Sequence, residues 1–101
     1  MTIPKRVRIG GIDYAIKHVP RLVSADGDLC NGLFDSNRSV IELNSENELS
    51  QGRIEQVLIH EILHGIVFTT GLNLEDEEIT VNVLAKGLYQ VIKDNPSLFA
   101  K

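Results

Sequence analysis

The sequence predicts a small α+β domain, in which a mostly antiparallel β-sheet made of two hairpins packs on two helices. Residues 6 to 43 form short runs of alternating apolar and polar side chains separated by turn residues, as half-buried strands do. Residues 53 to 70, and then about 74 or 75 to 93, carry apolar side chains at helical spacing. The length of 101 residues fits one domain, 1–101, because domains usually span roughly 100–200 residues.

Two hairpins are expected in the first half of the chain. The first spans residues 6 to 19 around a Gly-Gly turn. In its register Val7 and Ile9 face the core and the neighbouring arginines face water, so the basic run at residues 5 to 8 is a solvated strand face. The second hairpin pairs residues 29 to 34 with 39 to 43 around a polar four-residue turn.

Capping residues mark the two helices. Ser50 is placed to cap the first helix, Arg53 to Thr70, and Gly71 ends it. Acidic residues at 75 to 78 fill the first turn of the second helix, as the helix dipole favours. The apolar stripe predicted for this second helix consists of Val81, Leu84, Leu88 and Ile92.

Composition excludes several classes of partner. The net charge of −4 and the absence of a long basic cluster leave no electrostatic footprint for nucleic acid. No apolar run approaches 18 residues and no secretory signal follows residues 1 to 6, so no membrane association is expected and the protein is expected in the cytoplasm. The single Cys30 cannot form an internal disulfide and is expected to act as a small hydrophobe in a strand.

The first predicted helix contains the pattern H-E-x-x-H at His60-Glu61-Ile62-Leu63-His64. Residues four apart lie one above the other on a helix, so both imidazoles can reach one cation, while Glu61 lies beside that cation as a base. Random placement of 3 histidines and 8 glutamates in 101 residues gives about 0.007 such patterns. The helix is apolar nearly all round, and buried ionisable groups must be paired or bind a metal. The alternative is a pair of core histidines bonded to the backbone.

A catalytic zinc site needs a third protein ligand and an open position for water. Cys30 is distant in sequence and no further histidine follows, which leaves the carboxylates at 75 to 78 that the turn at Gly71 brings back against the first helix. Glu78 is favoured because Asn82, one turn beyond it, is placed to bond a ligand histidine. Glu77 remains the alternative ligand, since it lies nearer the centre of the apolar stripe.

These residues resemble the gluzincin clan of zinc peptidases, in which H-E-x-x-H is followed by Glu-x-x-x-Asp/Asn on the next helix. From the first hairpin through residues 57–65 to 84–96, the chain is similar to short phage-encoded proteins related to ImmA/IrrE-type metallopeptidases. The resemblance implies a zincin-like core, a phage or prophage origin, zinc ligands His60, His64 and Glu78, and Glu61 as catalytic base. The chain departs from the pattern at Asn82, where gluzincins often have Asp, and it has no insertion between His64 and Glu78 that forms a substrate pocket.

The predicted function is zinc-dependent hydrolysis of a peptide or protein substrate. Zinc lowers the pKa of bound water to about 7, and Glu61 takes the proton and passes it to the leaving amine. Tyr14, His18 and Tyr89 are the available oxyanion donors, although each also fits a strand or core position. A sheet edge from the second hairpin is a candidate site for an extended peptide. The alternative function is a non-catalytic zinc module that binds a host or phage protein; the sequence leaves the substrate and the oligomeric state open.

Overall fold

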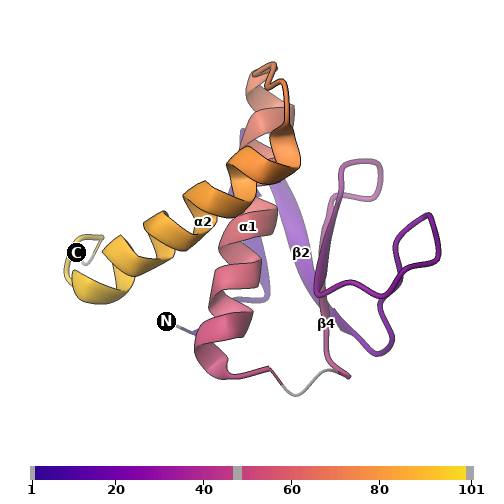
Figure 1. The fold of residues 1–101 in the computed structure, drawn as a ribbon, viewed down its shortest axis with the longest axis horizontal. Helices are drawn as coiled ribbons and strands as arrows, with labels where there is room; N and C mark the ends of the chain where they lie inside the picture. The colour runs from indigo at the N-terminus through magenta and orange to yellow at the C-terminus, as the bar shows by residue number, and fades with distance from the viewer. Residues whose placement is uncertain (1, 47–48, 100–101) are drawn as a thin grey trace.

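Four strands and two helices follow one another along the chain in the predicted order, ββββαα (Figure 1). They come from a computed structural model that describes residues 2–46 and 49–99. The elements are β1 (Arg6–Ile9), β2 (Ile12–Val19), β3 (Gly32–Asp35), β4 (Val40–Asn44), α1 (Gln51–Thr70) and α2 (Glu77–Asp94). The α+β class is therefore confirmed.

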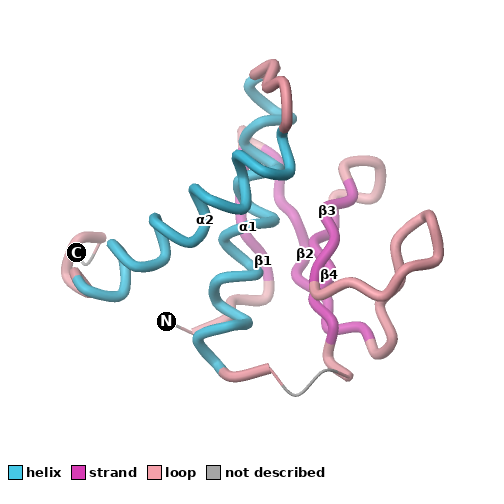
Figure 2. The backbone as a smooth tube through the Cα atoms, in the orientation of Figure 1, coloured by secondary structure: helices cyan, strands magenta, loops and turns pink. Residues whose placement is uncertain are grey.

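The four strands form one mixed sheet with the order β1-β2-β4-β3 (Figure 2). The two predicted hairpins supply its antiparallel pairs, β1 with β2 and β3 with β4. The sequence did not predict the joint between them, a parallel pairing of β2 with β4 in which Ile16 lies opposite Ile41. This order leaves β3 at an edge of the sheet, with one side of its backbone unpaired by any described strand.

Helix α1 lies between the sheet and α2, so the described part of the molecule has three layers (Figure 1). One core fills the space between α1 and the sheet. It contains the buried residues Ile9, Tyr14, Ile16, Ile41, Leu43 and Leu58. A smaller cluster joins α1 to α2 through Ile59, Ala85 and Tyr89. Burial on two sides explains the apolar residues nearly all round α1.

The apolar stripe predicted for α2 is wrong in part. Val81 is buried as expected, but Leu84 is 56% exposed and Leu88 39% exposed. Because α2 packs on α1 alone, only a narrow face is covered, and Ala85 and Tyr89 occupy it instead.

Capping fixes the helix boundaries. The Ser50 hydroxyl accepts a hydrogen bond from the Arg53 backbone N–H, and Gly71 adopts the left-handed conformation with φ 69° that ends α1. The Asp76 side chain accepts a hydrogen bond from the Ile79 N–H, so α2 begins at Glu77, two or three residues later than predicted. Within the described residues, neither helix is long and apolar enough to cross a membrane.

Candidate metal centre

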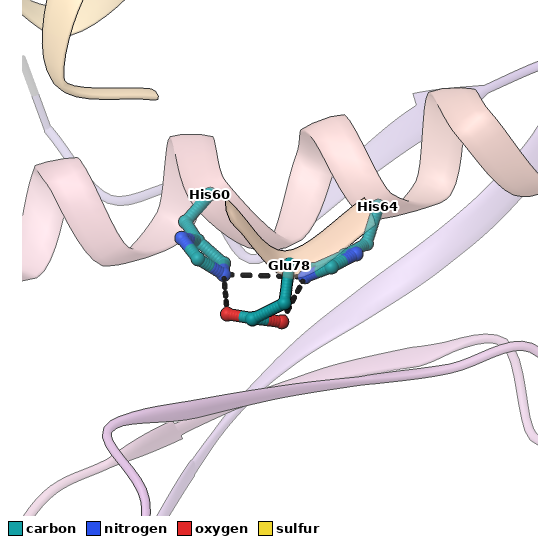
Figure 3. Close-up of side chains that lie close together, drawn as sticks. All are labelled: His60, His64 and Glu78. Atoms are coloured by element: carbon teal, nitrogen blue, oxygen red, sulfur yellow. Dashed lines mark hydrogen bonds and ion pairs between the residues drawn. The ribbon is translucent and has the colours of Figure 1, made fainter. Parts of the chain in front are cut away.

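Two histidines on successive turns of α1 form the centre of the site (Figure 3). The Nε2 atoms of His60 and His64 lie 3.2 Å apart, as the four-residue spacing on a helix allows. Their side chains are only 17% and 15% exposed. Burial lowers the pKa of His60, and neighbouring His64 lowers it further, while Glu78 opposes both effects. The lowered pKa favours the neutral form of His60, which is the form that binds a metal.

Glu78 reaches both histidines from the first turn of α2. Its Oε1 lies 2.9 Å from His60 Nε2, and its Oε2 lies 3.0 Å from His64 Nε2. The side chain is 71% exposed, so the group opens to solvent on this side. The turn at Gly71 reverses the chain and carries α2 back across α1, which is why Glu78 meets residues of the preceding helix.

The three side chains form a donor set that fits a zinc ion. One donor atom from each of His60, His64 and Glu78 can be chosen so that all lie within 4.8 Å of one another. Tetrahedral ligands at the usual 2.0–2.2 Å from zinc are separated by roughly 3.3–3.6 Å. The two Nε2 atoms, 3.2 Å apart, come close to that range, and each lies 2.9 or 3.0 Å from one of the two oxygens of the Glu78 carboxylate. Two imidazoles and one carboxylate are also the protein ligands of a known class of catalytic zinc sites.

Glu77 takes a different place from its neighbour. Its Oε2 lies 2.6 Å from Nδ1 of His64, on the opposite side of the ring from Glu78. A distance this short is typical of a charge-assisted hydrogen bond, in which the Nδ1–H donates to the carboxylate. A carboxylate on the far nitrogen orients a ligand histidine and raises its basicity. The sequence predicted Glu77 only as an alternative ligand. A ligand histidine usually needs an outer partner, such as a second carboxylate, on its other nitrogen, and this requirement could have assigned different roles to Glu77 and Glu78.

This hydrogen bond determines whether Nε2 of a neutral His64 carries a proton or a lone pair. When Nδ1 carries the proton, Nε2 carries a lone pair. That lone pair faces a carboxylate oxygen of Glu78 at 3.0 Å and the His60 ring nitrogen at 3.2 Å. Electron-rich atoms this close repel one another unless a proton or a cation lies between them. The arrangement therefore stabilises positive charge at the point where the three side chains meet.

Glu61 lies beside this group without joining it. It is 6% exposed, and burial raises the pKa of its carboxyl to about 7; nearby Glu78 adds to the effect and His64 opposes it. Gly32 at the start of β3 approaches it so closely that a Cβ there would lie 3.0 Å from Glu61 Oε2. Among the described residues, no side chain or backbone group forms a hydrogen bond with the Glu61 carboxylate. The Glu61 carboxyl is thus held in place by packing, and its two oxygens make no hydrogen bond with the described residues.

Two cavities of about 310 and 500 Å³ meet at the site. Both are lined by two residues of the candidate metal centre, by the adjacent Glu61 and by the segment that enters β3, namely His60, Glu78, Glu61, Cys30 and Gly32. The larger cavity continues over His64, Phe34 and Phe68. A molecule that enters either cavity therefore reaches His60 and Glu61.

The remaining site residues predicted from the sequence lie elsewhere. Asn82 lines the smaller cavity but, in the described part of the chain, bonds to neither histidine; Glu77 holds His64 instead. Tyr14 is fully buried in the core, and the Tyr89 hydroxyl donates to Glu55 at 3.0 Å. His18 is exposed on β2. None of these oxyanion candidates lines either cavity.

Cys30 lies closer to the site than its position in the sequence indicates. It precedes β3 and is not part of a strand, contrary to the prediction. Its Sγ donates to the Leu22 carbonyl at 3.8 Å, and burial, followed by the charges of Glu61 and Glu42, raises the pKa of the thiol. A protonated thiol is a poor metal ligand, which agrees with its place on the cavity wall.

Comparisons with protein-family models, with curated proteins and with solved structures found no match to this chain. The resemblance to gluzincin peptidases therefore stays a prediction. The case for a function rests on the positions of the side chains described above.

Proposed function

We propose that this protein is a zinc-dependent peptidase in which His60, His64 and Glu78 hold the metal and Glu61 is the general base. One observation carries the proposal: the Nε2 atoms of His60 and His64 lie 3.2 Å apart and within 2.9 to 3.0 Å of the Glu78 carboxylate. Beside them is the buried carboxyl of Glu61, which has no hydrogen-bond partner among the described residues. A site that only stabilises the fold has no use for such a carboxyl, and structural zinc sites usually have four protein ligands, often cysteines.

Glu77, Glu61 and Gly32 have separate roles in the proposed reaction. Glu77 keeps the Nδ1 proton of His64, so that Nε2 of this histidine points into the donor set. Bound zinc supplies Lewis-acid activation of the scissile carbonyl and of a water molecule. Glu61 accepts the proton of the attacking water and returns it to the amine that leaves when the C–N bond breaks. The close approach of Gly32 holds the Glu61 carboxyl in position for both transfers.

The sheet edge offers a place for the substrate. β3 has an unpaired edge among the described strands, and its Gly32, Leu33 and Phe34 line the larger cavity together with His60 and Glu61. An extended peptide that pairs with such an edge presents its backbone carbonyls in a fixed register. This arrangement supports a peptide as the substrate. We place the reaction in the cytoplasm, in a host cell if the protein is phage-encoded.

A second candidate function is a zinc module that binds a host or phage protein without cleaving it. The observation that favours it is the position of the predicted oxyanion donors, since Tyr14, His18 and Tyr89 all lie away from both cavities. Loss of such a donor costs roughly 10²–10³ in rate in acyl-transfer enzymes. Turnover by this chain is accordingly expected to be slow.

Hydrolysis of a peptide library by the zinc-loaded protein, followed by mass spectrometry, separates the two functions. The wild-type protein is expected to cleave, and Glu61→Gln to bind zinc with similar affinity but lose at least about 10²-fold in rate, the lower end of what a general base contributes. Equal cleavage by Glu61→Gln contradicts the assignment of the base. Zinc binding without cleavage by the wild type favours the binding module.

Zinc affinity tests the two glutamates separately. Glu78→Ala is expected to weaken zinc binding by more than roughly 100-fold because it removes a ligand, and Glu77→Ala by about 10- to 100-fold because it removes an outer partner. Glu75→Ala, an exposed neighbour, is the matched control and is expected to leave the affinity unchanged. A larger effect of Glu77→Ala than of Glu78→Ala reverses the assignment of the ligand.

A further inference from the structure

The smaller cavity beside the metal centre has two cations in its wall. Arg53 comes from the first turn of α1 and Lys86 from the middle of α2. Two amide side chains, Gln56 and Asn82, line the same cavity. All four are groups that donate hydrogen bonds to oxygen, and the two cations add attraction for negative charge.

Neither cation has a carboxylate partner in the part of the chain that the structure describes. By contrast, Arg8, Arg21 and Arg38 each pair with an aspartate or glutamate at 2.7 to 4.0 Å. Arg53 and Lys86 take part in no ion pair among residues 2–46 and 49–99. Their charges are therefore free to act on whatever occupies the cavity.

The cavity on the other side of the histidines has a different character. It is lined by Leu33, Phe34 and Phe68, and its additional charged residue is Glu77. No lysine or arginine among the described residues lines it. The two cavities share His60, Glu61 and Glu78, so a peptide that crosses the metal centre has one flank against cations and the other against apolar side chains.

We propose that Arg53 and Lys86 recognise a carboxylate of the substrate, and that the chain prefers peptides with a negative charge on one side of the bond that is cleaved. This inference rests on the proposed peptidase function and adds the substrate class. Glu61 and Glu78 are the acidic residues in the wall of this cavity, and the two oxygens of Glu78 lie 2.9 and 3.0 Å from the histidine nitrogens. The carboxylate belongs either to an aspartate or glutamate side chain or to the C-terminus of the peptide.

Calorimetric binding to the Glu61→Gln protein tests the preference without turnover. The probes are N-acetylated, C-amidated alanine hexapeptides that contain one glutamate or one glutamine, and an N-acetylated alanine hexapeptide with a free C-terminus. We expect one of the two carboxylate peptides to bind about tenfold more tightly than the glutamine peptide, because a partly exposed ion pair contributes about three- to fivefold per cation. The tighter of the two identifies the source of the carboxylate.

Charge-removing variants assign this preference to the cavity. Arg53→Gln and Lys86→Gln are each expected to reduce the ratio of affinities about threefold, and the double variant to bring it close to one. Lys93→Gln, on α2 but outside the cavity, removes the same charge and is expected to leave the ratio unchanged. An equal effect of Lys93→Gln, an unchanged ratio in the double variant, or no measurable binding of either carboxylate peptide overturns the proposal.

Measurement after removal of metal by a chelator separates this inference from the peptidase function. Because the preference comes from Arg53 and Lys86, the ratio is expected to persist in zinc-free protein. If the preference persists but the zinc-loaded wild-type protein cleaves no peptide, the cationic cavity is supported and the peptidase function is wrong. A preference that disappears with the metal means that the carboxylate binds zinc itself, which overturns the role of the cations.

Discussion

The packing of Gly32 against Glu61 predicts how a single methyl group damages the site. A Cβ at Gly32 would lie 2.7 Å from Val57 Cγ1 and 3.0 Å from Glu61 Oε2, whereas ordinary van der Waals contacts begin at 3.4 Å. The backbone at Gly32 does not have the positive φ found at other glycines of this chain, so alanine is conformationally allowed there. Gly32→Ala therefore acts by steric overlap alone.

The expected magnitude follows from that overlap. The Val57 contact is about 0.7 Å too short, so either β3 or α1 must move, or Val57 and Glu61 must both change rotamer. Overpacking of this kind costs roughly 1–3 kcal/mol of stability. A displacement of a catalytic group by close to 1 Å can reduce the rate by about 10²-fold. Zinc affinity is expected to change little, because the three atoms nearest to the added methyl belong to Val57 and Glu61, neither of which is a proposed zinc ligand.

Urea unfolding, zinc titration and peptide cleavage measure these three effects. Gly87→Ala is the matched control, since a Cβ there meets no atom within 4 Å and the residue lies inside α2. The control is expected to stabilise the protein by about 1 kcal/mol, the helix-propensity difference between glycine and alanine. A Gly32→Ala protein with wild-type stability and wild-type activity refutes the close packing of β3 against α1 on which the position of Glu61 depends.

Three further predictions concern the fold. The Tyr14 hydroxyl is buried without a hydrogen-bond partner in the described part of the chain, so Tyr14→Phe is expected to leave stability unchanged or to raise it by up to about 1 kcal/mol; a clear loss in urea unfolding contradicts this. Ile41→Ala, at a fully buried position in β4, is expected to cost about 2–5 kcal/mol in the same assay, and a cost below that range means that the core is looser than described. Hydrogen bonds from Arg38 hold the pKa of Asp35 below its ordinary value, so this carboxylate adds stability above the pKa of the unfolded chain, and the contribution disappears as pH falls through the folded pKa. Arg38→Gln is expected to raise the Asp35 pKa in an NMR titration, and an unchanged titration refutes the pairing.

The local parts of this structure could be predicted from the sequence. A helix places residues four apart on one side whatever surrounds it, so the convergence of His60 and His64 follows from the pattern. The hairpins follow from short turns between alternating strands. The parallel pairing of β2 with β4 could not be predicted, because β3 and the segment that leads to it lie between these two strands in the chain. The alternation of side chains within a strand carries no information about pairing between such distant strands.

The roles of Glu77 and Glu78 depended on where α2 begins. Each residue turns a helix by about 100°, so a start at Glu77, fixed by the Asp76 cap, sets which of the two adjacent carboxylates faces Nε2 and which faces Nδ1 of His64. The buried face of α2 depended on tertiary packing in the same way, because α2 contacts α1 alone and covers Ala85 in place of Leu84. The crossing of two helices, and the buried face that follows from it, is set by contacts that the sequence pattern does not contain.

Metal content is the most direct test of the metal centre. Elemental mass spectrometry of the purified protein, after exposure to zinc and removal of unbound metal, is to be compared with the same measurement on His60→Ala. Because His60 supplies one of three converging donors, we expect about one zinc per chain in the wild type and a large loss in the variant. Absence of zinc from the wild type, or equal zinc in both proteins, contradicts the assignment of His60, His64 and Glu78 as the metal site.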